Sequence, residues 1–117
     1  MRLYEFENHT ILWHGTSSDV KSKGLRMGGR LNGVYLTDNP DLAFEYAMTD
    51  AERTGSDVIY LLSIDITQLD MSLMQPDDDH TNSANDWVES LSETDQCVYY
   101  GDIPSSAINV EQVDEVD

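Results

Sequence analysis

The chain has 117 residues, a length that allows one domain but not two, and 39% of its residues are apolar and 25% charged, which suits a soluble domain. Its 23 acidic and 6 basic residues give a net charge of −17. No run approaches the roughly 18 apolar residues that a membrane-spanning helix needs, and the single cysteine excludes an internal disulfide framework. Since the first residues also lack the apolar core of a signal peptide, we expect a cytoplasmic protein, or one in the host cytoplasm if a phage encodes it.

The charge is unevenly distributed along the chain. All 6 Lys and Arg lie within residues 1–53, whereas residues 54–117 hold 15 acidic residues and no Lys or Arg. Direct binding to a nucleic-acid backbone is excluded, because phosphate contacts need cations, and nothing points to a membrane. Two interpretations of the charge stay open: solubility or adaptation to salty surroundings, and an acidic surface that steers the protein toward a basic partner.

In chain order, the first half predicts two strands and two helices. Apolar runs and breakers place a strand at Thr10–Trp13 that runs into a loop at His14, a short helix from Ser17 or Ser18 through Lys23 that Gly24 stops, a strand at Val34–Thr37, and a helix that begins at Pro40. Leu42, Ala43, Tyr46 and Ala47 recur at helical spacing in the last of these.

The second half predicts mainly strands. Val58–Ile66 is the clearest strand, and its apolar first half indicates a central position in a sheet. After it we expect a polar loop or insertion over residues 70–86, a helix over Asp86–Glu93, strands at Gln96–Tyr100 and Ala107–Val113, and a frayed acidic tail at Asp114–Asp117. The order predicts one α+β domain over residues 1–117, built on a small split β-sheet with short helices.

Histidine, glycine and threonine follow one another at the end of the first predicted strand. Gly15 lets the backbone approach a ligand closely, and the Thr16 hydroxyl lies beside it, although a histidine such as His14 at a strand edge is more commonly structural. Tyr35 ends the second strand and Tyr46 lies on the next helix, so both rings could converge on a flat heteroaromatic group. Taken alone, they fit core tyrosines better.

Four motifs occur in order at close spacing: Leu12-Trp13-His14-Gly15-Thr16, Gly24-Leu25-Arg26, Gly33-Val34-Tyr35-Leu36-Thr37-Asp38 and Leu42-Ala43-Phe44-Glu45-Tyr46-Ala47. They closely resemble the catalytic core of the diphtheria-toxin-like and poly(ADP-ribose)-polymerase-like ADP-ribosyltransferases. In that family a His-Gly-Ser/Thr strand precedes a helix ending in Gly-Leu, then a Gly-x-Tyr strand and a helix with a second tyrosine. Tyr35 and Tyr46 have the family's separation of 11 residues. The resemblance spans roughly residues 11–110; its motifs are specific in the first half and only loose in the second.

This resemblance implies NAD as a co-substrate and a role for each matching residue. His14 would hydrogen-bond ribose hydroxyls, and the Gly15 backbone would bind the nicotinamide amide with the Thr16 hydroxyl nearby. Tyr35 and Tyr46 would sandwich the nicotinamide ring. The implied chemistry is cleavage of the bond between nicotinamide and ribose, followed by capture of ADP-ribose by an acceptor.

A basic loop and the start of a late strand also bear on this function. Arg26 and Arg30 lie on the loop that in this family passes near the ligand, so we infer that one neutralises the pyrophosphate; solvated loop charges are the alternative. The family's last catalytic residue is usually a glutamate at the start of a late strand, and Gln96 falls there. A glutamine amide can hold a hydroxyl but accepts no proton. Asp95 fits only if the strand shifts by one residue, which would turn its side chain to the other face, and Glu93 is a further candidate.

Three lesser features each have a structural alternative. Asp77-Asp78-Asp79-His80 could hold a divalent cation or form a solvated loop, and we expect no metal. Cys97 could be taken for a nucleophile, but an apolar strand makes a buried small residue the better interpretation. Trp13 and Trp87 are expected in the core.

The resemblance implies a mono-ADP-ribosyltransferase that modifies a macromolecular target. The acidic second half indicates that this target is a protein with a basic surface, and the small size suits a bacteriophage or bacterial effector. Gln96 weighs against polymerase activity more than against single transfer. The alternatives are a catalytically silent NAD- or ADP-ribose-binding module, an acidic inhibitor that mimics nucleic acid, and an RNA 2′-phosphotransferase, which would need a basic surface.

Overall fold

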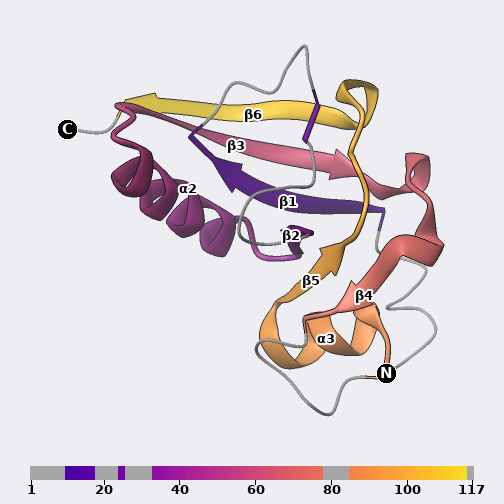
Figure 1. The fold of residues 1–117 in the computed structure, drawn as a ribbon. Helices are drawn as coiled ribbons and strands as arrows, with labels where there is room; N and C mark the ends of the chain where they lie inside the picture. Colours follow the sequence, from indigo (N-terminus) through magenta and orange to yellow (C-terminus); the bar gives the residue numbers. More distant parts are fainter. Residues whose placement is uncertain (1–9, 18–23, 26–32, 78–84, 116–117) are drawn as a thin grey trace.

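The computed structural model describes residues 10–17, 24–25, 33–77 and 85–115, which form an α+β domain (Figure 1). The described residues contain the strands β1 (Ile11–Thr16), β2 (Val34–Thr37), β3 (Val58–Asp65), β4 (Met74–Pro76), β5 (Gln96–Tyr99) and β6 (Ile108–Glu115), and the helices α2 (Pro40–Thr54) and α3 (Trp87–Thr94). Short 3-10 helices lie at Ile66–Gln68, Met71–Leu73 and Ser105–Ala107. The α+β class expected from the sequence is confirmed.

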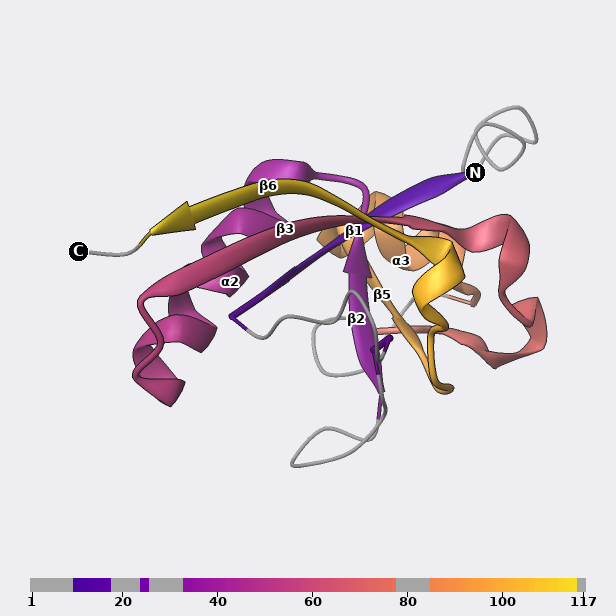
Figure 2. The same cartoon turned by 90° about the horizontal axis from the view of Figure 1, so that it is seen from above.

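The strands form one antiparallel sheet in the order β4-β5-β2-β1-β3-β6, and this sheet consists of two halves. Six residues of β1 pair with β3, and four residues of β2 pair with β5. Between the halves, β1 and β2 are in register only where Trp13 lies opposite Thr37. Figure 2 shows the result: β2 and β5 run at a steep angle to β3 and β6.

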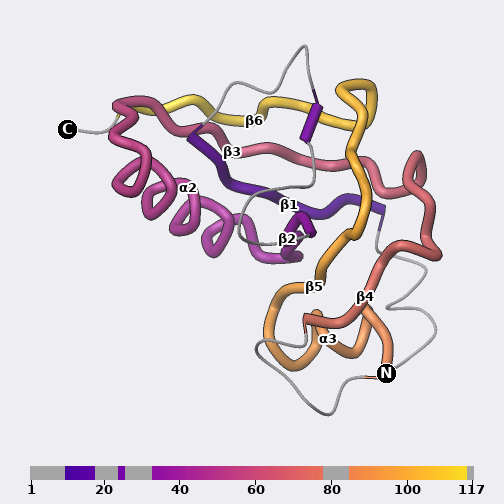
Figure 3. Tube along the Cα trace, viewed as in Figure 1, coloured from indigo at the N-terminus to yellow at the C-terminus, as the bar shows by residue number. Residues whose placement is uncertain are grey.

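Helix α2 lies along β1 and β3, as the tube in Figure 3 shows. The helix begins where the sequence predicts: the Asn39 side chain caps it by accepting from the Asp41 N–H at 3.0 Å, and Pro40 occupies the first turn. The residues that face the sheet are alanines, Ala43, Ala47 and Ala51, each buried. Small side chains allow the helix backbone to approach the strands closely.

Helix α3 packs against β4 and β5 at the other end of the sheet. The Asp86 side chain caps it by accepting from the Glu89 N–H at 2.8 Å. As expected, the helix buries Trp87, Val88 and Leu91. All three join the main core, whose largest fully buried side chains include Leu12, Leu36, Leu62 and Ile64. Trp87 belongs to this core, whereas Trp13, also expected there, is only half-buried.

Three expectations about the strands are wrong. Thr10–Trp13 does not run into a loop at His14, because the strand continues to Thr16 in register with β3. Residues 70–86 are not simply a loop, since β4 pairs with β5 there and forms an edge of the sheet. Asp114 and Glu115 are not a frayed tail, because β6 pairs them with Ile59 and Val58.

Strand β3 is interior but lies next to the edge strand β6. It is buried without interruption from Leu61 to Ile64, and its first half alternates between half-buried and buried residues, with Ile59 buried. The helix expected up to Lys23 lies outside the described residues, apart from Ser17, which is not helical. No helix among the described residues is long and apolar enough to span a membrane.

Candidate functional site

The pairing of β1 with β2 opens immediately after Trp13. The Ile66 N–H donates to the Thr10 carbonyl at 3.0 Å, in the register that pairs β1 with β3. Because backbone groups of successive residues in an antiparallel strand point to alternate sides, the N–H and C=O of Trp13 and Gly15 point away from β3, toward β2. Trp13 meets Thr37 there, but Gly15 has no register partner among the described residues of β2. The peptide groups of Gly15 therefore face the opening between the two halves of the sheet.

The His14 side chain connects the two halves of the sheet at this opening. Its Nδ1 lies 2.7 Å from the carbonyl oxygen of Tyr35. A carbonyl only accepts, so Nδ1 carries the proton and Nε2 of the neutral ring is an acceptor. Burial lowers the pKa of His14, although the Tyr35 carbonyl and the charge of Asp50 act to raise it. The ring is therefore neutral at pH 7.

Gly15 is required for the packing of α2 on β1. A Cβ atom at this position would lie 1.7 Å from the carbonyl oxygen of Ala43 and 2.9 Å from the nitrogen of Ala47. The space that a side chain would need is thus filled by the helix backbone. What Gly15 offers to a ligand is the edge of its backbone. Thr16, the next residue, is buried.

The two tyrosines lie on β2 and on α2. Tyr35 is half-buried, and Tyr46 is exposed over 40% of its surface. Phe44, on one side of the helix, packs against the cluster that Ala47 and Ala51 form with Ile59 of β3. Tyr46 lies on the other side of the line of buried alanines, one helical turn before Asp50. Tyr46 is therefore on the side of α2 that faces away from β3.

Gln96 begins β5 and lies opposite Thr37, which in turn lies opposite Trp13. The strands β1, β2 and β5 are adjacent, so the structure brings His14, Tyr35 and Gln96 onto three neighbouring strands. Gln96 is 4% exposed. Its backbone carbonyl accepts from two hydroxyls of α3, Ser90 Oγ at 2.6 Å and Thr94 Oγ1 at 3.0 Å, which fixes the start of the strand.

The alternatives to Gln96 lie outside β5. Asp95 is the C-cap of α3, with a left-handed φ of 64°, and it is exposed. Its carbonyl accepts a hydrogen bond from the Thr37 hydroxyl. Glu93 is an exposed residue of α3. Of the three positions, Gln96 is the one in the row of residues that crosses β5, β2 and β1.

Several of the expected residues lie outside the part of the chain that the structure describes, and another is buried in the core. Arg26 and Arg30 lie outside the described residues, as do Asp78, Asp79 and His80. Cys97 is fully buried, and burial raises the pKa of its thiol well above the ordinary value. A thiol that stays protonated is a poor nucleophile, which agrees with a packing role.

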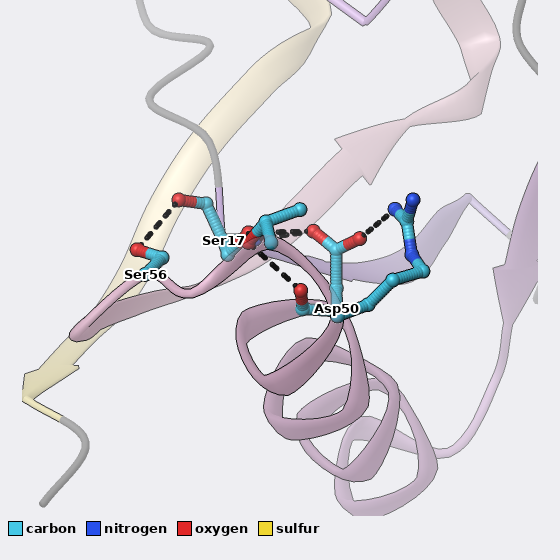
Figure 4. Close-up of polar contacts among 5 residues, drawn as sticks. Ser17, Asp50 and Ser56 are labelled. Atoms are coloured by element: carbon cyan, nitrogen blue, oxygen red, sulfur yellow. Dashed lines mark hydrogen bonds and ion pairs between the residues drawn. The ribbon is translucent and has the colours of Figure 1, made fainter.

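The sequence did not reveal a polar cluster that joins the end of β1 to the last turns of α2 (Figure 4). The backbone N–H and the hydroxyl of Ser17 both donate to Oδ2 of Asp50, at 2.9 and 2.7 Å. Oδ1 of Asp50 accepts from Arg53, and the Ser17 hydroxyl lies 3.0 Å from that of Thr54. Burial acts to raise the pKa of Asp50, but the hydrogen bonds from Ser17 and Arg53 outweigh it and lower the pKa. Asp50 is therefore ionised at neutral pH.

Comparisons of the chain with protein-family models, with curated proteins and with solved structures find no match.

Proposed function

We propose that this chain is an NAD-dependent mono-ADP-ribosyltransferase with the fold of that family. One observation carries the proposal: the sheet order puts the motif strands β1, β2 and β5 side by side, with His14 Nδ1 bonded to the Tyr35 carbonyl where β1 and β2 separate. A sequence resemblance alone requires no such neighbourhood. His14 and Tyr35, which are 21 residues apart in the sequence, meet where β1 and β2 separate, and a ligand bound there could contact both.

The residues at this opening fit a nicotinamide group. A primary carboxamide needs one acceptor for its N–H and one donor for its carbonyl. Gly15 offers both from a single residue, since its C=O and N–H point away from β3 and lie beyond the last register pair with β2. The flat ring then needs aromatic neighbours, and Tyr35 and Tyr46 lie on the two elements that flank the Gly15 backbone.

NAD would supply the ADP-ribose group through the bond that joins its ribose to nicotinamide. In this proposal, His14 accepts a hydrogen bond from a ribose hydroxyl at Nε2, because its Nδ1–H is already used by Tyr35. Gln96 holds a second ribose hydroxyl with its amide. Because an amide carries no charge, the chain forgoes the electrostatic stabilisation that a carboxylate would give there, a loss of about 10²–10³ in rate in comparable sites.

The acceptor that we propose is a protein with a basic surface. Residues 54–117 contain 15 acidic residues and no Lys or Arg, so a basic protein is attracted and an anionic one is repelled. A second function is favoured by one specific observation. Gln96 is almost fully buried and has no charge, which also suits a module that binds NAD or ADP-ribose without transferring it.

The test is incubation of the protein with NAD labelled at the adenylate phosphate, in a lysate that contains candidate acceptors. We expect label on a protein band, and no label with His14→Ala or Tyr35→Ala. Release of nicotinamide in the absence of acceptor is measured in parallel, for the wild type and for Gln96→Glu. The Glu variant should hydrolyse NAD faster than the wild type. Binding of NAD without label transfer or nicotinamide release would leave only the binding module, and no binding at all would overturn both functions.

A further inference from the structure

The polar cluster of Ser17, Asp50 and Arg53 lies beside the proposed NAD site, and the strand and the helix that form it run in the same direction. Gly15 contacts α2 at Ala43 and Ala47, and Ser17, two residues later, contacts it at Asp50. Going along the chain from Gly15 to Ser17, which follows the end of β1, therefore also goes along α2, from the level of Tyr46 to the level of Asp50 and Arg53.

Tyr46, Asp50 and Arg53 form one stripe on α2, because residues four and then three apart share a helix face. This is the side of the helix away from Phe44 and β3. The separation of seven positions between Tyr46 and Arg53 corresponds to a rise of about 10 Å. Such a separation suits a ligand that extends one nucleoside unit from a ring at Tyr46 to an anionic group at Arg53.

Arg53 is oriented and yet accessible. Its guanidinium donates to Oδ1 of Asp50, whose Oδ2 is held by two hydrogen bonds from Ser17. The Arg53 side chain nevertheless remains 62% exposed. Since a guanidinium has five N–H donors, those that do not face Asp50 stay available to a ligand. A fixed fork of this kind loses little conformational entropy on binding a phosphate.

The charge of the chain favours a cation at a site that binds a dinucleotide. The net charge is −17, and the diphosphate of NAD carries further negative charge. Repulsion between them would oppose binding unless a cation stands at the site. Arg26 and Arg30, which the sequence suggests for this role, lie outside the described residues, and among the described residues Arg53 is the one Lys or Arg.

We infer that Arg53 binds the diphosphate of the dinucleotide, with Asp50 and Ser17 as the residues that position its guanidinium. This inference rests on the proposed function, since it concerns the same ligand. It gives the ligand a direction: the nicotinamide lies at Gly15 and Tyr46, and the diphosphate lies beyond the end of β1.

The test is calorimetric titration with two probes, ADP-ribose, which carries the diphosphate, and nicotinamide, which does not. Arg53→Gln should weaken the binding of ADP-ribose about tenfold or more, because charge-assisted hydrogen bonds are lost, and should leave the binding of nicotinamide unchanged. Arg53→Lys keeps the charge but loses the planar fork, so its affinity for ADP-ribose should lie between those of the wild type and Arg53→Gln. Gln75→Glu, at the exposed middle of β4, changes the net charge by the same amount as Arg53→Gln and should leave both affinities unchanged.

The outcomes separate this inference from the proposed function. If Arg53→Gln binds ADP-ribose as the wild type does while His14→Ala does not, the inference is overturned and the NAD site stands. If Gln75→Glu weakens ADP-ribose as much as Arg53→Gln, the effect is one of net charge and the inference is again overturned. If the wild type binds neither probe, the proposed function fails, and the inference with it. Circular dichroism of each variant checks that the fold is retained.

Discussion

Gly15→Ala is the substitution whose effect follows most directly from the structure. The added Cβ would lie 1.7 Å from the carbonyl oxygen of Ala43, 2.7 Å from its carbonyl carbon and 2.9 Å from the nitrogen of Ala47. All three are backbone atoms of α2, so no change of rotamer can relieve the clash. Ordinary contacts of a Cβ begin at 3.4 Å, and α2 must therefore withdraw from β1 by about 1.7 Å.

The expected cost exceeds that of ordinary overpacking. Inserting a methyl group into a packed core costs about 1–3 kcal/mol, and here the helix also loses contacts of the buried Ala43, Ala47 and Ala51 with the strands. We expect the free energy of unfolding to fall by about 3 kcal/mol or more, measured by urea denaturation followed by circular dichroism. With a typical urea dependence of about 1–3 kcal/mol per molar, the midpoint would fall by about 1 M or more.

Gly55→Asn is the matched control for this experiment. Gly55 has a left-handed φ of 74°, and no atom lies within 4 Å of a Cβ placed on it. Asparagine tolerates this conformation, so the control should cost less than about 1 kcal/mol. Equal stability of Gly15→Ala and the wild type would refute the direct packing of α2 on Gly15, and with it the placement of Tyr46 and Arg53 relative to β1.

Three other predictions concern single side chains. Asp50→Ala should lower the free energy of unfolding by about 1–3 kcal/mol, because it leaves the Ser17 donors without their acceptor. Glu52→Ala, on the exposed face of α2, should change it by less than about 0.5 kcal/mol. Similar losses in the two variants would contradict the role of Asp50. By NMR, His14 should titrate below its ordinary pKa of 6.5 and lower still in Asp50→Asn, which removes a charge that raises the pKa. Because the unfolded chain then takes up this proton first, the contribution of His14 to stability should fall as the pH drops through 6.5, and a pKa at or above 6.5 would refute the burial of the ring. Cys97 should resist thiol reagents at pH 8 until the protein is unfolded in urea, and rapid reaction of the native protein would show that β5 is not buried as described.

The helices could be predicted from the sequence because their signals are local. Asn39 and Pro40 start α2, and Asp86 starts α3, through hydrogen bonds and dihedral angles that involve only neighbouring residues. The errors concern features that depend on distant partners. Gly15 looks like the end of a strand, but pairing with β3 continues the strand past it. Strand β4 is three residues long and ends in Pro76, so only its pairing with β5 identifies it.

The candidate site could be predicted in part, for the same physical reason. The motif order pointed to His14, Tyr35 and Gln96, but not to the hydrogen bond that joins His14 to the Tyr35 carbonyl. The contact of Ser17 with Asp50 spans 33 residues, and neither residue belongs to a recognisable motif. The packing role of glycine at position 15 also required the helix to be placed, since the clash arises from backbone atoms of α2.

The central claim is that a nicotinamide group binds at the backbone of Gly15, where β1 and β2 separate. Its most direct test is an NMR titration of the 15N-labelled protein with nicotinamide and with NAD, following the Gly15 amide. We predict a saturable shift of this amide with both ligands, which is lost in Tyr35→Ala although the spectrum of the variant remains that of a folded protein. Saturable binding that leaves the Gly15 amide unshifted, or no binding at millimolar ligand, would contradict the claim.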